Sequence, residues 1–141
     1  MTSITVNNPF ASEQITTDDP KQQEWQLDVA RQFKAAATMG VLMSLGAHEL
    51  RAVPGVHTLG GLFFIARILP MTKNGRGSRP ALMAVMVSVT GIDEIDIDVR
   101  RLRDGVEHAT VRGIYIDQLA AALLALDYDG PEIFNPSYWS N

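Results

Sequence analysis

Acidic side chains at alternate positions are the first feature of this sequence that could carry chemistry. Glu94, Asp96 and Asp98 alternate with Ile95 and Ile97. Residues two apart in a strand point to the same side, and carboxylate oxygens are the ligands that Mg²⁺ and Mn²⁺ prefer. One interpretation is therefore a metal-dependent hydrolase or nuclease that uses Asp96 and Asp98, with a third metal ligand from elsewhere in the chain.

The competing interpretation is a solvated strand face, with the isoleucines turned to the core and the acids to water. The arginines that could neutralise such a face are Arg100, Arg101, Arg103 and Arg112. Like charges at every second position repel, so an acidic ladder also suits a basic protein partner. We predict Glu94, Asp96 and Asp98 as binding residues, and we predict no metal site.

A basic, glycine-rich connection between two apolar runs is the second candidate. It contains Lys73, Arg76 and Arg79, with Gly75 and Gly77 between them. Such a loop can hold phosphate through its cations and exposed backbone amides. It does not fit the dinucleotide or Walker patterns, because a proline replaces the third glycine and no Walker lysine motif occurs.

Two interpretations of this basic loop stay open. We predict Lys73, Arg76 and Arg79 as a site for a partner or an anion, nucleic acid included. The alternative is a solvated hairpin tip whose charges keep the edge of an apolar hairpin soluble.

The motifs of familiar enzyme classes are missing. The chain has no cysteine, which removes thiolate nucleophiles and cysteine zinc sites. Its three histidines lack a zinc-binding spacing, and none of its serines lies in a nucleophile-elbow sequence. We predict no catalytic residue and no cofactor; the question of an enzyme stays open, leaning against one.

The elements that must position these residues begin with a helix. Asp19 before Pro20 is a helix N-cap followed by proline at the first helical position. Apolar residues then recur every three or four positions as far as Leu45, and Gly46 is a suitable stop. The pattern predicts one continuous amphipathic helix.

The next segments read as strands. Leu62 to Met71 and Ala81 to Thr90 are nearly continuous apolar runs, which is typical of central strands covered on both faces. After the acidic strand, Asp104-Gly105 predicts a hairpin that returns through Glu107 to Ile116. This return would bring Arg112 opposite the acids.

A shorter helix follows, with Asp117 predicted as its N-cap. Its apolar stripe contains Leu119, Ala122, Leu123 and Leu126. The order of elements predicts an α+β fold, an antiparallel β-meander of about four strands covered by a long N-terminal helix and a shorter C-terminal helix.

The domain organisation predicted from composition is simple. Residues 1–18 form a flexible N-terminal arm, residues 19–130 a single domain, and residues 131–141 a tail with aromatic side chains. In that tail, Tyr138 and Trp139 are a predicted interface.

The net charge of −4 argues against general attraction to nucleic acid or anionic lipid, and no apolar run is long enough to span a membrane. Without cysteine or a visible signal segment, we expect a cytoplasmic protein. The function that we predict is a non-enzymatic interaction module, adaptor or inhibitor in type. It would be a homodimer that binds a protein partner through charged hairpins and a helix face.

Overall fold

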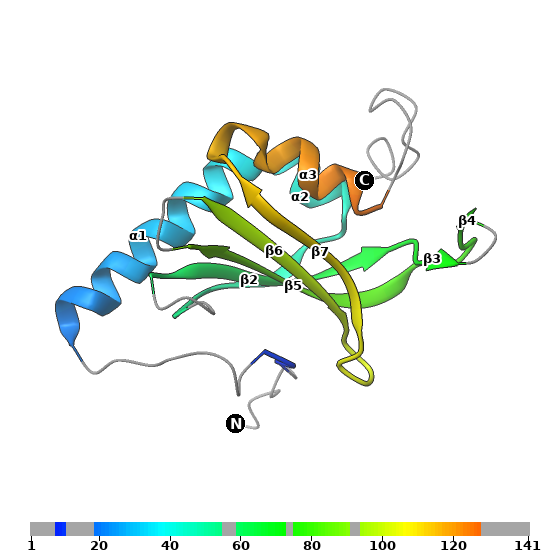
Figure 1. The fold of residues 1–141 in the computed structure, drawn as a ribbon, viewed down its shortest axis with the longest axis horizontal. Helices are drawn as coiled ribbons and strands as arrows, with labels where there is room; N and C mark the ends of the chain where they lie inside the picture. Colours follow the sequence, from blue (N-terminus) through cyan, green and yellow to red (C-terminus); the bar gives the residue numbers. More distant parts are fainter. Residues whose placement is uncertain (1–7, 11–18, 55–58, 73–74, 91–93, 128–141) are drawn as a thin grey trace.

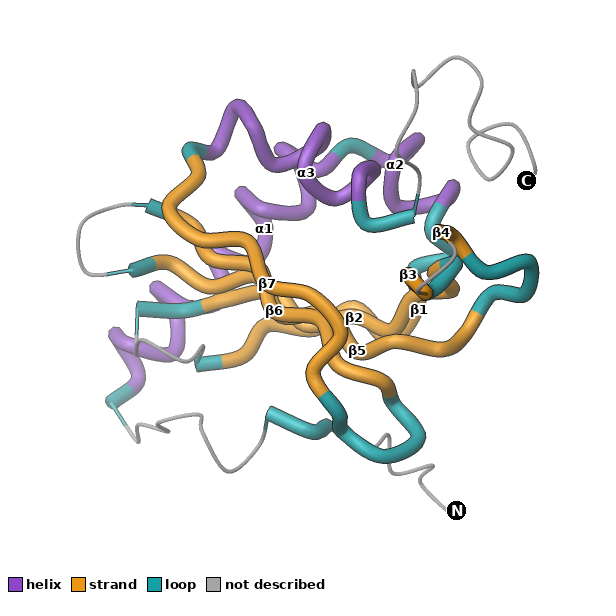
Figure 2. The backbone as a smooth tube through the Cα atoms, turned by 45° about the vertical axis from the view of Figure 1, so that its right-hand side comes forward, coloured by secondary structure: helices purple, strands orange, loops and turns teal. Residues whose placement is uncertain are grey.

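The computed structural model describes residues 8–10, 19–54, 59–72, 75–90 and 94–127, with the backbone alone at 71, 72, 75 and 76. One antiparallel sheet carries the α-helices of this part of the chain on one of its faces (Figures 1 and 2). The structure confirms the predicted α+β class, with five strands in the main sheet where about four were expected.

The main sheet is a meander in which neighbours in sequence are neighbours in space, in the order β1-β2-β5-β6-β7. Its strands are β1 (His48–Val53), β2 (Gly61–Ile68), β5 (Ala81–Val89), β6 (Ile95–Arg101) and β7 (Glu107–Ile114). The two predicted apolar runs are β2 and β5, which pair along their whole length. A two-stranded ladder, β3 (Met71–Thr72) with β4 (Gly75–Arg76), extends the connection between them.

The predicted single N-terminal helix is wrong, because the structure has two. Helix α1 (Pro20–Ala37) begins after Asp19, whose side chain accepts a hydrogen bond from the backbone of Lys21. At Thr38 the backbone leaves the helical region, with φ 69° and ψ 147°, and the Thr38 hydroxyl accepts from Val41 to cap α2 (Met39–Ser44). The break lets α2 bury its own side chains against α3.

The last helix begins differently from the prediction. A short 3-10 helix, η2 (Ile116–Gln118), precedes α3 (Leu119–Ala125). Tyr115 is the N-cap of η2, and Asp117 lies inside its first turn, so Asp117 is not the cap. Leu119 and Leu123 are completely buried, as the predicted apolar stripe requires.

The sheet divides the buried apolar residues into two clusters. The larger cluster joins the helices to alternate residues of the strands, among them Phe64 of β2, Val85 of β5 and Ile97 of β6. The smaller cluster lies on the second face and consists of Phe10, Val53, Phe63, Ile65, Ala84 and Met86, with Leu102 against it. Both faces of the central strands are therefore packed, as their continuous apolar sequences predict.

Asp127, just after α3, ties that helix to the end of β2. It is 2% exposed, and its Oδ1 accepts a hydrogen bond of 2.7 Å from the backbone N–H of Leu69. Its Oδ2 is buried with no hydrogen-bond partner. The contact fixes the strand end next to Pro70.

None of the helices described is long and apolar enough to cross a membrane.

Replacing Asp127 by alanine should lower the free energy of unfolding by about 1–3 kcal/mol, the usual cost of losing a buried hydrogen-bond partner. Asp127→Asn keeps a carbonyl oxygen for Leu69 and should lose less. Urea unfolding followed by circular dichroism measures both. The control is Asp28→Ala on the exposed surface of α1, expected within about 0.5 kcal/mol of the parent. Equal losses for Asp127→Ala and Asp28→Ala would contradict this role.

Candidate functional site

A cavity of about 480 Å³ lies where the end of β2, the start of β5 and the turn after β6 meet. Its lining is apolar apart from two arginines and consists of Pro70, Ala81, Leu82, Arg101, Leu102 and Arg103. We call it the two-arginine pocket. Its volume is in the range of pockets that accept a small ligand or a few side chains.

The pocket is held by the register of β5 and β6. The backbone N–H of Leu102 donates to the carbonyl of Leu82 at 3.1 Å, which places these two lining residues side by side. At another lining residue, Pro70, the carbonyl accepts a hydrogen bond of 2.7 Å from the N–H of Gly77. Leu82 is 46% exposed although it is a large apolar residue. An apolar contact surface is thus available to a ligand.

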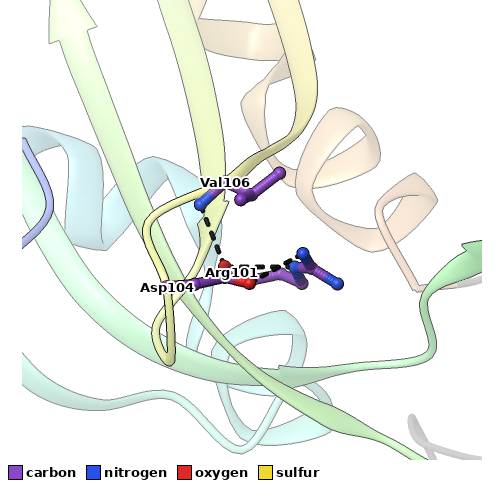
Figure 3. Close-up of polar contacts among 3 residues, drawn as sticks. All are labelled: Arg101, Asp104 and Val106. Carbon is purple, nitrogen blue, oxygen red and sulfur yellow. Dashed lines mark hydrogen bonds and ion pairs between the residues drawn. The ribbon is translucent and has the colours of Figure 1, made fainter.

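Asp104 positions Arg101 in the lining (Figure 3). The Arg101 Nε donates to Asp104 Oδ1 at 3.2 Å, and its Nη2 donates to Oδ2 at 2.7 Å, which makes a bidentate pair. Asp104 Oδ1 also accepts from the backbone N–H of Val106 at 3.1 Å, and this closes the turn predicted at Asp104-Gly105. The guanidinium of Arg101 is therefore fixed by the turn itself.

A hydrogen bond and nearby charges in this turn lower the pKa of the Asp104 carboxyl. The pKa of Asp104 is lowered from its usual 3.8, first by the hydrogen bond from the Val106 N–H and then by the charge of Arg101, with a smaller contribution from Arg103. Desolvation opposes the shift but does not cancel it. The lowered pKa favours the ionised form of Asp104, whose carboxylate pairs directly with Arg101.

Arg103 leaves the pocket with a net positive charge. Its side chain is exposed, and no carboxylate is among the lining residues. Arg79, one of the three cations predicted in the basic loop, is also exposed and precedes Ala81 by two residues. Of the other two, Arg76 is placed as backbone in β4, and Lys73 lies outside the described residues.

The predicted acidic face is not solvated. Asp96 and Asp98 of β6 are 6% and 8% exposed, and Arg112 of the neighbouring strand covers them. The Arg112 Nη2 donates to Asp98 Oδ1 at 2.7 Å, and its Nη1 lies 3.8 Å from Asp96 Oδ2. The hydrogen bond from Arg112 to Asp98 raises the pKa of the arginine further. Arg112 thus lies opposite the acids, as predicted.

A bulge in β7 completes the cover over the acids. The register between β6 and β7 shifts after Ile95, and Gly113 adopts φ +67°. Its backbone N–H donates to Asp96 Oδ1 at 3.1 Å, and a Cβ at this position would lie 2.8 Å from Glu94 Oε2. The conformation favours glycine here, whereas the Glu94 carboxylate lies at the end of a flexible side chain that can move aside. Alternation in β6 predicts which side of the sheet Asp96 and Asp98 face. It does not predict that Arg112 and Gly113 of β7 cover them.

This arrangement does not resemble a metal site. Arg112 and the Gly113 N–H already bind oxygens of Asp96 and Asp98, and no third His, Asp or Glu joins them within the described residues. Two carboxylates and one arginine form a local network that joins β6 to β7.

The structure adds pocket residues that sequence reading did not select, namely Pro70, Leu82, Arg101, Leu102 and Arg103. One signal was present, because three arginines lie within four residues just before the predicted Asp104-Gly105 turn. Their separate roles depend on strand alternation and on the turn. The predicted interface residues Tyr138 and Trp139 lie outside the described residues.

Comparisons with protein-family models, with curated proteins and with solved structures gave no match for this chain.

Arg112→Met should lower the free energy of unfolding by roughly 1.5–3 kcal/mol, the range for hydrogen bonds to charged groups. It removes the arginine that contacts two largely buried carboxylates, so the loss should exceed that of a surface ion pair. Arg31→Met is the matched control, because Arg31 makes a surface ion pair of 3.5 Å with Asp28. Chemical unfolding would contradict the network if both variants lost the same free energy.

The carboxyl of Asp104 should titrate below 3.8 in a ¹³C NMR pH series. In Arg101→Gln its pKa should rise but stay below 3.8, since the Val106 N–H remains. Because the pKa is depressed in the folded protein, the stabilisation is present above the unfolded pKa and is lost as pH falls through the folded one. A wild-type value at or above 3.8 would contradict the turn geometry.

Proposed function

We propose that this protein is a protein-interaction module that binds an acidic, apolar segment of a partner protein at the two-arginine pocket. The observation that carries the proposal is the lining itself, four apolar residues beside two arginines with no carboxylate among them. An apolar side chain buried in such a pocket, with charged contacts at its edge, is a common anchor in protein interfaces.

Charge favours an acidic partner. The chain as a whole carries −4, so positive potential at Arg79 and Arg103 is a local property. Acidic surfaces elsewhere on the molecule would repel an acidic partner, and this repulsion selects the orientation in which the partner docks. Exposed carboxylates next to a leucine or phenylalanine side chain would match both features of the pocket.

The basic loop belongs to the same proposed surface. The base of the β3–β4 extension is tied to the pocket by the bond from Gly77 to Pro70. Arg79 would then extend the positive surface beyond the cavity. Asp96 and Asp98 are not part of this surface, because their oxygens are engaged by Arg112 and Gly113.

Nucleic acid is the alternative occupant of the same cations. The apolar lining favours a peptide, because a phosphate backbone uses the arginines but gains little from exposed Leu82. The hydrolase alternative has less support, since Asp96 and Asp98 lack a third ligand among the described residues.

Self-association is a further part of the proposal. Strand β7 is an edge of the main sheet, and Tyr115 and Ile116 directly after it are exposed. An edge strand with apolar neighbours suits pairing with a second copy. The absence of cysteine supports a reducing compartment, and we propose the cytoplasm.

The test is a fluorescence-anisotropy titration with three labelled peptides of equal length. One has a leucine flanked by glutamates, the second has alanine in place of that leucine, and the third has lysines in place of the glutamates. The wild-type protein should bind the first at least tenfold more tightly than the others. Arg103→Glu and Leu82→Ser should each weaken that binding at least tenfold, without a change in melting temperature, because both side chains are exposed.

Arg31→Glu on the exposed surface of α1 is the matched charge-reversal control, and it should bind like the wild type. Equal binding by Arg103→Glu, or no binding of the acidic leucine peptide at millimolar concentration, would overturn the proposal. A single-stranded oligonucleotide that binds more tightly than the peptide, with affinity falling steeply as salt rises, would replace it with the nucleic-acid alternative.

A further inference from the structure

The second face of the sheet carries a short segment from far away in the sequence. Residues 8–10 lie against this face, on the side opposite the helices (Figures 1 and 2). Phe10 is completely buried there, although it belongs to the stretch expected from sequence to be a flexible arm. In the smaller cluster it is the one member, among the described residues, that comes from outside the sheet and its turns.

The floor under Phe10 is built by two strands in register. Phe63 of β2 lies opposite Met86 of β5, and Ile65 lies opposite Ala84 in the same pair of strands. All four are buried, with exposures from 0 to 3%. Across the next pair, Ala84 lies opposite Arg100, so the apolar floor ends at a cation.

Arg100 holds the segment in two ways. Its Nη1 donates a hydrogen bond of 2.9 Å to the carbonyl of Pro9, and its guanidinium carbon lies 4.5 Å from the centre of the Phe10 ring. An arginine over an aromatic face is a favourable cation–π contact. Arg100 therefore contacts both the backbone of Pro9 and the ring of Phe10.

The segment is also shaped for this contact. The Asn8 side chain accepts from the backbone N–H of Phe10 at 3.0 Å, a local turn of the kind that asparagine favours before proline. Gly105 in the β6–β7 turn faces the proline, and a Cβ there would be 3.4 Å from Pro9 Cβ, an ordinary van der Waals contact. All of these contacts are to a short linear stretch.

We propose that this face is a binding site for a segment of a partner protein with a proline followed by an aromatic residue. In this chain Asn8-Pro9-Phe10 occupies the site in cis and competes with the partner. The groups that recognise the segment are an apolar floor, one arginine and the glycine of a turn, and none of them requires the ligand to belong to the same chain. A cis occupant lowers the apparent affinity for a free peptide by the fraction of time it fills the site.

The site is distinct from the two-arginine pocket, although Leu102 borders both. It selects a proline carbonyl and an aromatic ring, whereas the pocket is proposed to select carboxylates. This inference therefore does not rest on the proposed function. The Arg103→Glu variant separates the two, because it should abolish the acidic peptide's binding and leave the second face unchanged.

The probe is a labelled, end-capped peptide of residues 6–12, which carries no charge. It should bind the Phe10→Ala protein at least tenfold more tightly than the wild type, because the cis ring is removed. The double variant Phe10→Ala/Arg100→Gln should lose at least tenfold of that affinity. A probe with alanine in place of its phenylalanine should not bind, and Phe10→Ala/Arg31→Gln should behave like Phe10→Ala.

Methyl NMR of Met86 keeps the test decisive if Phe10→Ala does not fold. Excess peptide with tryptophan in place of its phenylalanine, added to wild-type protein, should then shift the Met86 resonance, since an indole replaces the Phe10 phenyl ring over the same floor. No shift at millimolar peptide, or undiminished binding by a folded Phe10→Ala/Arg100→Gln double variant relative to Phe10→Ala, would overturn the proposal. A wild-type dimer that Phe10→Ala abolishes would overturn the assignment to a separate partner and make a second copy the occupant.

Discussion

Strand β5 is buried on both faces, and the rest of the structure depends on this constraint. From Met83 to Ser88 all six consecutive residues are buried. Half of these side chains point to each side of the sheet, so a single layer of helices cannot cover them. The helices cover one side with the larger cluster. The other side needs its own cover, and Phe10 supplies it over the floor that β5 and β2 share.

The same alternation separates three arginines that are close in sequence. Arg100 turns to the second face and binds the carbonyl of Pro9, while Arg101 pairs with Asp104 in the turn. Arg103 is beyond the strand and exposed. The three arginines thus take three roles: a contact to the peptide segment, an ion pair in the turn and an exposed cation. The two-arginine pocket and the face under Phe10 meet at the turn after β6, where Leu102 borders both.

Sequence patterns predicted the features that local chemistry determines. Continuous apolar runs identified β2 and β5, and the Asp104-Gly105 pair identified the turn, because strand burial and turn geometry depend on nearby residues. The break at Thr38 was missed, since the apolar helical period continues through it. The burial of Asp96 and Asp98 was also missed, because it depends on contacts from Arg112 and Gly113 of the neighbouring strand. The contact between Arg100 and Pro9 joins residues 91 positions apart, a separation that no local pattern reports.

The bulge at Gly113 has an evolutionary consequence. A side chain there would require an unfavourable backbone conformation, so substitution should be selected against wherever the carboxylate network is retained. Diverging descendants of this chain should then keep an acid-x-Asp-x-Asp strand followed, after the turn, by an adjacent Arg-Gly pair. The spacing in this chain is 14 residues from Asp98 to Arg112 and 17 from Asp96 to Gly113. This pattern is a heritable signature by which distant homologues can be recognised after their surfaces have changed.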